Sequence, residues 1–578
     1  MKRKYLKISL LVFIVFSFIS LGYYYIDKST EYRQIAGVKY YNTEDISNLA
    51  VLCKVWGYLK YYHPSVVEGK FNWDDELVKM MPAVLKATSK DERNNILSEW
   101  VTSLGGFKQD TFPEISKDSV KMYPDLDWLK DKKELGLLSH QLEEIKTAKR
   151  DSDKTNYLEF PPNDLGTFRG EKAYNETTYP STEFRLLGLF RFWNVIQYYY
   201  PYKYLIGENW HNVLQDFIPK FINAKNELEY KLDLLELLTK LNDTHASIGY
   251  ERAIEKWKGG NIAPYEVSFI QGKLVVTAIY EVVILNNANH SLQVGDVISS
   301  INKTSVDDYI KEKIKYAPGS NYAAQLLEIT RFILRTNEEL LDVEYIHKGK
   351  CLQSKLFCYN MGKVKITSKF DRNEVLYKII RDSIGYLYLG STQGGEVPQN
   401  IQAKGLIIDL RCYPSYEKIT GYFNYMQLYS KPKAFVKFTL GDSHLPGLFR
   451  FLGTTRVGRK NSNAYKGKKI ILVNEITRSH AEFMAMKYRV AENSIIIGST
   501  TAGADGGVFN LKMPGGITTS FTGAGVYYPD GRETQRVGIV SDIVVKPTIK
   551  GIQEGKDEVL EKAIKLITKK PDKLNNYK

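Results

Sequence analysis

An internal duplication constrains the fold of this chain more than any other sequence feature. Leu52-x-x-x-Trp56 aligns with Leu189-x-x-x-Trp193 at an offset of 193 − 56 = 137 residues, and the alignment continues without a gap. Both segments keep the 3, 4, 7 spacing of an apolar helix face, so each copy is predicted to form a helix, a loop and two more helices. The further matches are Tyr61 with Tyr198, Tyr62 with Tyr199, Pro64 with Pro201, Trp73 with Trp210, Leu77 with Leu214, Pro82 with Pro219 and Ala87 with Ala224.

The duplicated segments define a helical domain that we expect to span residues 28–258. Its copies lie at about 49–108 and 186–245, and the tyrosines and tryptophans they share are expected to form the core of the domain. Residues 110–180, between the copies, are charged and broken by five prolines. We therefore expect an irregular insert there, and we assign no motif to it.

A serine follows a predicted strand in the C-terminal part of the chain. The strand covers residues 470–473, and a helix is predicted to begin just after Ser479. At a helix N-terminus, unpaired N–H groups and the helix dipole favour negative charge, as the oxyanion of acyl transfer requires. Ser479-x-x-Glu482 also fits a capping box, in which the serine caps an amide and the glutamate reaches back to the cap. The turn alone leaves both interpretations open.

Five further segments, two before this turn and three after it, have strand or glycine-turn patterns. They are residues 384–389 (IGYLYL), 406–411 (LIIDLR), 498–507 (GSTTAGADGG), 526–531 (VYYPDG) and 538–543 (GIVSDI). In their order and spacing, these segments resemble the tail-specific, carboxy-terminal processing serine peptidases and their relative, the tricorn protease core. The resemblance implies a crotonase-like (ββα spiral) catalytic domain over residues 361–568, with Ser479 as the nucleophile.

The lysine base of the bacterial processing peptidases is absent from this chain. In that branch it lies in a G-K-G turn 25 residues after the serine, and the matching stretch, around 479 + 25 = 504, reads Gly503-Ala504-Asp505. Lys487 lies 487 − 479 = 8 residues along the predicted helix, which is about 12 Å of helix axis. A general base must reach its proton within hydrogen-bond distance. The base therefore has to come from another part of the chain.

His245 is the best candidate for the base. It lies in residues 241–248, LNDTHASI, which resemble the tricorn segment where a small hydroxyl residue precedes the catalytic histidine. The resemblance implies that His245 takes the proton of Ser479 and that Thr244 helps to hold the last member of the catalytic chain. An ordinary histidine pKa near 6.5 leaves the imidazole neutral and basic at about pH 7. A purely structural role for this histidine remains the alternative.

Two residues compete for the acidic position. The tricorn glutamate position, three residues before Gly538, falls on Gln535, whereas a true carboxylate, Glu533, lies two residues earlier on the expected same face of a strand. Gln535 could orient Thr244 or a water molecule, but an amide cannot stabilise an imidazolium by charge. Both candidates stay open.

The predicted oxyanion turn also departs from the family pattern. The family follows Asp-Leu-Arg with N-P-G-G, whereas this chain reads CYPSY at residues 412–416. Backbone N–H groups of Ser415 and His480 are the expected donors, although the glycine freedom to adopt positive φ is lost. These departures keep a second function open, namely a non-catalytic peptide- or ligand-binding scaffold on the same fold.

A strand-rich segment separates the histidine from the serine. Residues 292–302, LQVGDVISSIN, resemble the G-D-x-I-x-x-I-N strand and turn of PDZ domains, so we expect a PDZ-like domain over residues 259–360. PDZ domains add a peptide strand to an open sheet edge and hold a terminal carboxylate. Because the usual carboxylate-binding loop is not evident near residues 267–269, a purely structural role is the alternative.

The N-terminus predicts the location of the protein. Four basic residues among the first seven precede an apolar run at residues 8–26, about the length that spans a bilayer. Residues 1–27 are therefore expected to be a membrane anchor or a signal peptide, and the positive-inside rule places residues 28–578 outside the cytoplasm, in the periplasm or at the cell surface.

The resemblance and the expected domains together imply a multidomain α/β protein, and the composition excludes other classes. The chain is 43% hydrophobic and 25% charged, as globular proteins are. Its net charge of +14 is spread along the chain and includes a basic tail at residues 569–578, so no nucleic-acid surface is expected. Without a P-loop, a dinucleotide fingerprint or metal-ligand spacing, we expect no cofactor and no metal. The sequence predicts an extracytoplasmic serine endopeptidase that acts on peptides or protein tails.

Overall fold

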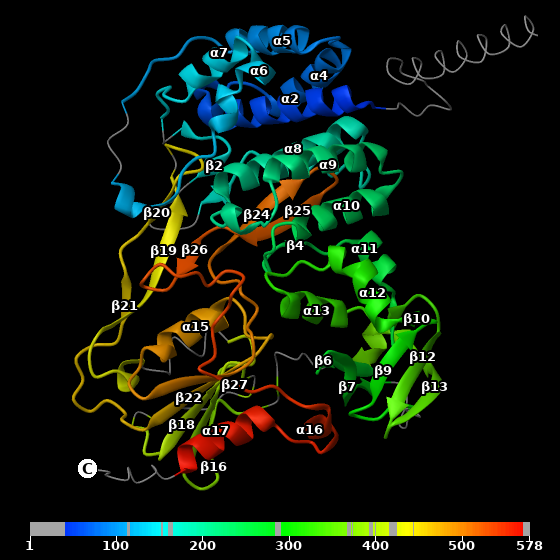
Figure 1. The fold of residues 1–578 in the computed structure, drawn as a ribbon, viewed down its shortest axis with the longest axis vertical. Coiled ribbons are helices and arrows are strands. Elements are labelled where there is room, and N and C mark those ends of the chain that lie inside the picture. Colours follow the sequence, from blue (N-terminus) through cyan, green and yellow to red (C-terminus); the bar gives the residue numbers. More distant parts are fainter. Residues whose placement is uncertain are drawn as a thin grey trace, which may run out of the picture.

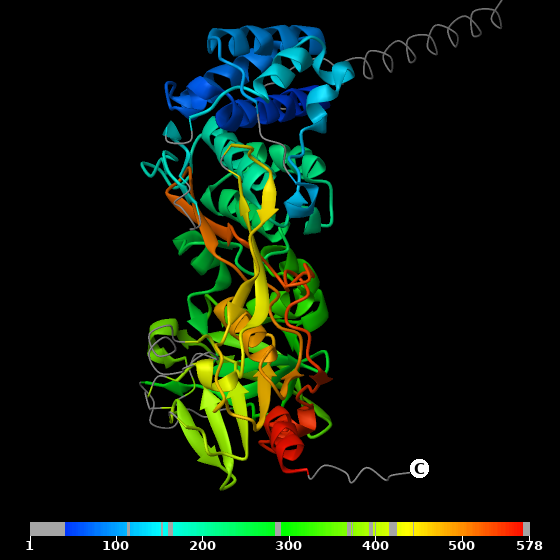
Figure 2. The same ribbon diagram turned by 90° about the vertical axis from the view of Figure 1, so that its left-hand side faces the viewer.

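The computed structural model describes residues 41–569, apart from 112–115, 152–153, 160–165, 284–290, 367–371, 373, 392, 394–396, 399, 415–424 and 443. The predicted anchor at residues 1–27 and nearly all of the basic tail lie outside the described residues. The molecule is elongated, with two layers of helices at one end and a parallel sheet at the other (Figures 1 and 2). This arrangement confirms a multidomain α/β protein with a helical N-terminal region. Within the part of the chain described, none of the helices combines the length and the apolar character needed to cross a bilayer.

The first helical layer begins with a capped helix. The Asn42 side chain accepts the N–H of Asp45, and the Asp45 carboxylate accepts the N–H of Asn42, so both groups of a capping box are made. The Trp56 indole donates to the Trp73 carbonyl at 2.9 Å, and the Trp73 indole donates to the Trp56 carbonyl at 3.0 Å. The helices of this layer are α2 (Thr43–Tyr62), α3 (Pro64–Val67), α4 (Trp73–Lys86) and α5 (Lys90–Ser103).

The second helical layer repeats this pairing of tryptophans. At the 137-residue offset, the Trp193 indole donates to the Trp210 carbonyl at 2.8 Å and the Trp210 indole donates to the Trp193 carbonyl at 3.0 Å. The layers meet where α2 crosses α8, and a Cβ added at Gly57 would lie 1.9 Å from the Asn194 side chain. Only glycine admits this approach. The helices of this layer are α8 (Thr182–Tyr199), α9 (Trp210–Asn223) and α10 (Glu227–Thr239).

The segment at residues 110–180 is less irregular than the sequence predicts. It contains α6 (Lys132–Leu135) and α7 (Leu138–Ile145), which pack on the first layer, and the Tyr58 hydroxyl donates to the Leu142 carbonyl at 2.9 Å. The prediction was wrong here because it gave more weight to the prolines and charges of the segment than to a short apolar pattern. In that pattern Leu135, Leu138, Leu142 and Ile145 repeat at helical spacing, and all four are buried. Short strands complete the segment: β1 (Val120–Met122), β2 (Leu158–Glu159) and β3 (Thr167–Phe168).

A separate sheet follows the helical layers, in the order β13-β12-β9-β7-β6. Alternate residues of β12 are buried, the pattern of a strand with one face on a core. Two helices, α12 (Val306–Lys313) and α13 (Tyr322–Thr330), accompany the sheet. Its strands are β6 (Tyr265–Ile270), β7 (Lys273–Ile279), β9 (Val297–Ile301), β12 (Leu340–His347) and β13 (Lys350–Phe357). The smaller elements around it are α11 (Arg252–Lys258), β5 (Asn261–Ile262), β8 (Glu281–Val282), β10 (Thr304–Ser305), β11 (Arg335–Thr336), β14 (Tyr359–Asn360) and β15 (Val364–Lys365).

The C-terminal part of the chain is built on a second sheet, ordered β16-β17-β18-β22-β23-β27. Its four central strands are parallel, and β17, β18 and β22 are buried along nearly their whole length, as a sheet covered on both faces requires. Its strands are β16 (Tyr377–Ile380), β17 (Ile384–Tyr388), β18 (Gly405–Asp409), β22 (Lys468–Val473), β23 (Ser494–Gly498) and β27 (Ile543–Val544). The accompanying helices are α15 (His480–Arg489), α16 (Ile549–Gln553) and α17 (Glu558–Thr568).

Two extensions connect this C-terminal sheet to the helical layers. In the first, β19 pairs with β20 and β26, β20 pairs with β1, and the Tyr62 hydroxyl donates to the Pro446 carbonyl. In the second, the β24–β25 hairpin pairs with β4, which directly follows His245. These extensions bring the histidine segment against the C-terminal domain. Their strands are β4 (Ser247–Ile248), β19 (Lys433–Gly441), β20 (Phe449–Phe451), β21 (Thr455–Val457), β24 (Val508–Met513), β25 (Ile517–Thr522) and β26 (Gly525–Tyr527).

Candidate active site

Ser479 lies on a sharp turn between β22 and α15, as the sequence predicts. Its backbone has φ 52° and ψ −118°, a conformation that residues with a side chain rarely adopt. An ordinary N-cap residue has an extended backbone with negative φ. Strained conformations of this kind persist where the surrounding contacts enforce them, and they cluster at functional sites. The backbone of Ser479 therefore supports a role beyond capping the helix.

Glu482 supplies the contacts that hold this turn. Its buried carboxylate accepts the N–H of Ser479 at 3.2 Å, of Ala504 at 3.0 Å and of Gly503 at 2.8 Å, together with the Thr501 hydroxyl. Burial raises the pKa of Glu482, and these four hydrogen bonds oppose the rise. Ser479 N–H also donates to the Ala504 carbonyl at 2.8 Å. The position that the resemblance gives to the lysine base thus lies beside the serine, where this chain has only a methyl group.

Lys487 does not replace the missing lysine. It lies two turns further along α15, and its ammonium group stacks on the Phe483 ring, 4.4 Å from the ring centroid. This placement agrees with the helix geometry expected from the sequence.

His245 lies in the loop between α10 and β4, and the two nitrogens of its ring have different surroundings. Nδ1 lies 2.9 Å from the Thr522 hydroxyl. Nε2 is buried and has no hydrogen-bond partner within the described ranges. Burial lowers the pKa of His245 below 6.5; the negative charge of Asp243 partly offsets this, and the positive charge of Arg478 adds to it. The ring is therefore neutral near pH 7, as a general base must be.

Asp243 and Thr522 are site residues that the sequence analysis did not single out. The Asp243 carboxylate is fully buried and accepts the Thr522 hydroxyl at 2.9 Å, the Thr522 N–H at 2.7 Å and the His245 N–H at 3.0 Å. An acidic residue two positions before the histidine was the available signal. Nothing local marks Thr522, which lies at the end of β25, 279 residues after Asp243.

Gln535 and Glu533 occupy different surroundings. Gln535 is buried, and its amide donates to Asp243 Oδ1 at 3.3 Å and to the Ser320 hydroxyl at 3.4 Å. Glu533 instead accepts the Lys121 ammonium at 2.6 Å and the Tyr204 hydroxyl at 2.8 Å. The expectation that both share one strand face was wrong, because Glu533 forms an isolated bridge with Tyr527 whereas Gln535 already lies in the turn at residues 535–537. Of the two candidates, only Gln535 reaches the histidine loop.

Thr244 braces the loop instead of contacting the imidazole. Its hydroxyl donates to the Ala502 carbonyl at 2.9 Å and accepts the Ser320 N–H at 2.9 Å. The Ser320 hydroxyl in turn accepts the Thr244 N–H at 2.8 Å. Asn321, the N-cap of α13, donates to the Thr501 carbonyl at 2.9 Å. The histidine loop, the start of α13 and the loop at residues 501–502 therefore meet at one place.

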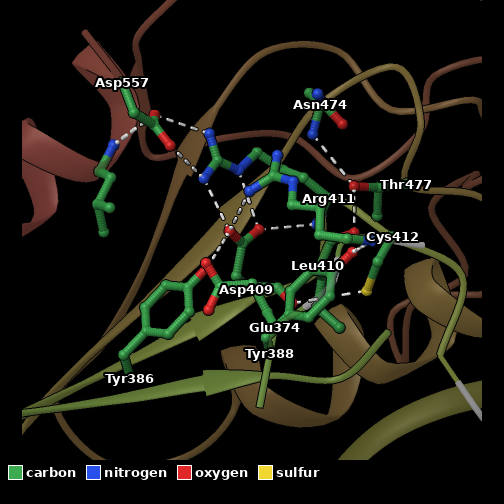
Figure 3. Close-up of polar contacts among 12 residues, drawn as sticks. Glu374, Tyr386, Tyr388, Asp409, Leu410, Arg411, Cys412, Asn474, Thr477 and Asp557 are labelled. Carbon is green, nitrogen blue, oxygen red and sulfur yellow. Dashed lines mark hydrogen bonds and ion pairs between the residues drawn. The ribbon is translucent and has the colours of Figure 1, made fainter. Parts of the chain in front are cut away.

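One of the two expected oxyanion donors lies within the described residues. His480 is the first residue of α15, so its N–H belongs to the helix N-terminus that Ser479 adjoins. Ser415 lies outside the described residues, but the turn that leads to it begins at a tightly bound arginine. Arg411 pairs with the buried Asp409 at 2.7 Å and with Asp557 at 2.8 Å, as Figure 3 shows.

The serine turn and the arginine turn are joined directly. The Thr477 hydroxyl donates to the Leu410 carbonyl at 2.7 Å and accepts the Asn474 N–H at 3.1 Å (Figure 3). Burial would raise the pKa of Asp409, but the guanidinium of Arg411 lowers it to about 2. The carboxylate is therefore charged at physiological pH and fixes this end of β18 beside the serine turn.

Ser479 and His245 line a single cavity of about 550 Å³. The helical domain contributes the histidine loop, α13 contributes a wall, and the turn before α15 contributes the serine. A volume of this size holds several residues of an extended peptide. Its charged and phenolic lining residues are Lys258, Tyr316, Glu328, Arg331, Tyr413, Glu475 and Arg478. In the ranges that the structure describes, no cluster of three or more His, Cys, Asp or Glu side chains could hold a metal ion.

Comparisons with known proteins point to the same part of the chain. Residues 391–545 match the model of peptidase family S41. A protein of Chlamydia trachomatis serovar D is 30% identical over 131 residues, which cover 22% of this chain and only 22% of that protein.

Among solved structures, mature CPAF complexed with lactacystin is similar to this chain, with a TM-score of 0.50 and 14% identity over 67% of this chain and 99% of that one. A serine-to-alanine mutant of CPAF gives a TM-score of 0.51 and 14% identity over 68% of this chain and 99% of that one. At this identity, the likeness concerns the fold.

Proposed function

We propose that this chain is a serine endopeptidase that cleaves peptides or protein tails, since residues 391–545 match the model of peptidase family S41, a family of serine hydrolases. The observation that carries the proposal is that Ser479 and His245 line one cavity. His245 Nε2 is buried there and has no hydrogen-bond partner among the described residues. The family match agrees with the resemblance on which the sequence prediction rests.

The proposed reaction follows ordinary acyl transfer. His245 Nε2 takes the proton of the Ser479 hydroxyl while the serine oxygen bonds to the substrate carbonyl carbon. The N–H of His480, with that of Ser415, stabilises the oxyanion. The imidazolium then returns its proton to the leaving amine as the C–N bond breaks, and a water molecule hydrolyses the acyl-enzyme by the same route. Ser479 lines the cavity from its position just before the first turn of α15.

The proposed substrate is an extended peptide, and the middle domain supports this choice. A five-strand path with β6 at its edge supports a PDZ-like domain, and a second cavity of about 140 Å³ is lined by β6, α13 and residues of the C-terminal part of the chain such as Ser499. A peptide strand added along β6, an edge strand of its sheet, would lie in this groove. The crotonase-like character of the catalytic domain, the domain limits at residues 258, 360 and 568, and the capture of a terminal carboxylate belong to the same proposal.

The proposed location is outside the cytoplasm, with residues 1–27 as an anchor or a signal peptide. This part of the proposal rests on the N-terminal charge and apolar run alone. Fractionation of cells that express the full chain, with protease added to intact cells or spheroplasts, tests it. Protection of residues 28–578 from the added protease would contradict the proposed orientation.

A non-catalytic scaffold is the competing function, favoured by Ala504 at the lysine position and by the altered oxyanion turn. Incubation of the purified protein with an unfolded protein substrate separates the two. We expect internal cleavage by the wild-type protein and none by Ser479→Ala. Tight binding of the substrate without cleavage by either protein would favour the scaffold.

A further inference from the structure

The histidine loop contains a chain of three groups that ends in a buried carboxylate. His245 Nδ1 lies 2.9 Å from the Thr522 hydroxyl, and the same hydroxyl lies 2.9 Å from Asp243 Oδ1. Thr522 and Asp243 are both fully buried. The Thr522 N–H and the His245 N–H also donate to Asp243, so the carboxylate is held by the backbones of both of its neighbours in this chain of groups.

Proton counting assigns the direction of each hydrogen bond in this chain. An ionised carboxylate only accepts hydrogen bonds, and a hydroxyl has one proton to give. The Thr522 proton is therefore used on Asp243, and Thr522 must accept its second bond from a proton on His245 Nδ1. The neutral ring then carries its lone pair on Nε2, which is the nitrogen that is buried and unpartnered in the described part of the chain.

Given the proposed peptidase function, we propose that Asp243, acting through the Thr522 hydroxyl, is the acidic member of the catalytic chain in place of Gln535. When Nε2 takes the Ser479 proton, the positive charge of the imidazolium faces the Thr522 oxygen, whose dipole is oriented by the Asp243 charge. The Nδ1 proton and the hydroxyl proton stay where they are. Both residues act on His245 and not on the substrate, so they are positioning residues.

Gln535 has a subordinate part in this arrangement. Its amide donates to Asp243 at 3.3 Å and contributes no charge. Tyr200 lies in the same surroundings, where burial and the Asp243 charge raise its pKa, so its phenol stays neutral. The charge opposite the imidazolium therefore comes from Asp243. Arg478 also acts on the ring by its charge, and it lines the cavity together with Glu328, Arg331, Glu475 and Lys258.

The test compares fluorophosphonate labelling rates of the full chain and four variants. Thr522→Val removes the hydroxyl at nearly constant volume, Thr522→Ser restores it, and Asp243→Asn removes the charge. Thr519→Val is the matched control, because Thr519 is a buried threonine of the same strand whose hydroxyl points to the Leu511 carbonyl. We expect Thr522→Val to label about 10- to 100-fold more slowly at about pH 7, with Thr522→Ser and Thr519→Val close to the wild type.

The pH profile separates positioning from loss of structure. Asp243→Asn should move the acid limb of the labelling profile to lower pH, because the negative charge that favours the protonated ring is gone. Equal rates and profiles for the wild type, Thr522→Val and Asp243→Asn would overturn the inference while leaving the peptidase intact. An unlabelled wild-type protein would contradict the proposed function instead.

A measurement on the wild-type protein keeps the inference testable if Thr522→Val fails to fold. In selectively ¹⁵N-histidine-labelled wild-type protein, with the His245 signals assigned from His245→Asn, the neutral ring should carry its proton on Nδ1. A proton on Nε2 would overturn the inference whatever the activity of the protein.

Discussion

The carboxylate of Glu482 accepts a hydrogen bond from the backbone N–H of Ser479 at 3.2 Å. The residue that closes the first turn of α15 therefore also holds the serine in its unusual backbone conformation. The same carboxylate accepts the N–H groups of Gly503 and Ala504, so it fixes the glycine-rich loop beside the serine. In the sequence, capping and catalysis were alternative roles for this turn. In the structure, the Glu482 hydrogen bond of a capping box occurs together with a serine whose backbone has positive φ.

Glu482→Gln is expected to slow the reaction of Ser479 and to destabilise the loop at residues 501–504. An amide retains one acceptor oxygen, so at least one buried N–H loses its partner, which costs about 1–3 kcal/mol. The fluorophosphonate labelling rate and the thermal midpoint should both fall. Glu492→Gln, a partly exposed glutamate just beyond the same helix, serves as the control. Unchanged labelling in Glu482→Gln would show that the carboxylate does not position the serine.

His245 should set the acid limb of the pH–rate profile. Because burial and Arg478 lower its pKa, kcat/KM should rise with pH through one ionisation below about 6.5 and then stay level. His245→Ala should lower kcat by about 10²- to 10⁴-fold with the thermal midpoint nearly unchanged. A rise centred near pH 8 or above would indicate a different base.

Local signals in the sequence were enough to select Ser479 and His245 as candidates, and the structure places both on one cavity. A strand, a turn and a helix identify Ser479, and a short segment that resembles a known motif identifies His245. Asp243 and Thr522 could not be paired in this way, because their contact depends on the β24–β25 hairpin returning to β4. Glu533 and Gln535 show the opposite limit: strict alternation predicts one strand face for both, but the strand pairing ends before Gln535, which lies in a turn.

The duplication was equally visible in the sequence, because both copies retain the tryptophans whose indoles bond each other's carbonyls. The helices at residues 132–145 were missed because their apolar pattern covers only about three turns. A pattern that short is easily masked by the charges and prolines around it.

Arg411→Met should be strongly destabilising. It leaves the Asp409 carboxylate buried without its main counter-ion, and breaking such a pair costs about 3–5 kcal/mol. Because the folded-state pKa of Asp409 is lowered to about 2, its contribution is present above about pH 4 and is lost as the pH falls toward 2. Replacing both residues, with Asp409→Leu added, should recover much of the thermal midpoint. No recovery would show that the arginine acts mainly through Asp557.

Asp505→Asn should make stability less dependent on pH. Burial and the neighbouring Glu482 charge raise the pKa of Asp505 well above its usual value. Between about pH 4 and that raised pKa, the folded state binds a proton that the unfolded state has lost, so stability falls as the pH rises, by up to about 1.4 kcal/mol per unit. Thermal midpoints across this range should therefore slope less steeply in Asp505→Asn. The exposed Asp307→Asn serves as the control, and equal slopes in Asp505→Asn and the wild type would contradict the account.

Peptide mapping of the fluorophosphonate adduct tests the central claim most directly. The wild-type protein should carry the label on Ser479, Ser479→Ala should carry none, and Ser499→Ala, a serine on the neighbouring groove, should label like the wild type. Because the label reports the reacting hydroxyl itself, the result does not depend on knowing the natural substrate. A label on another residue, or a label that persists in Ser479→Ala, would contradict the account.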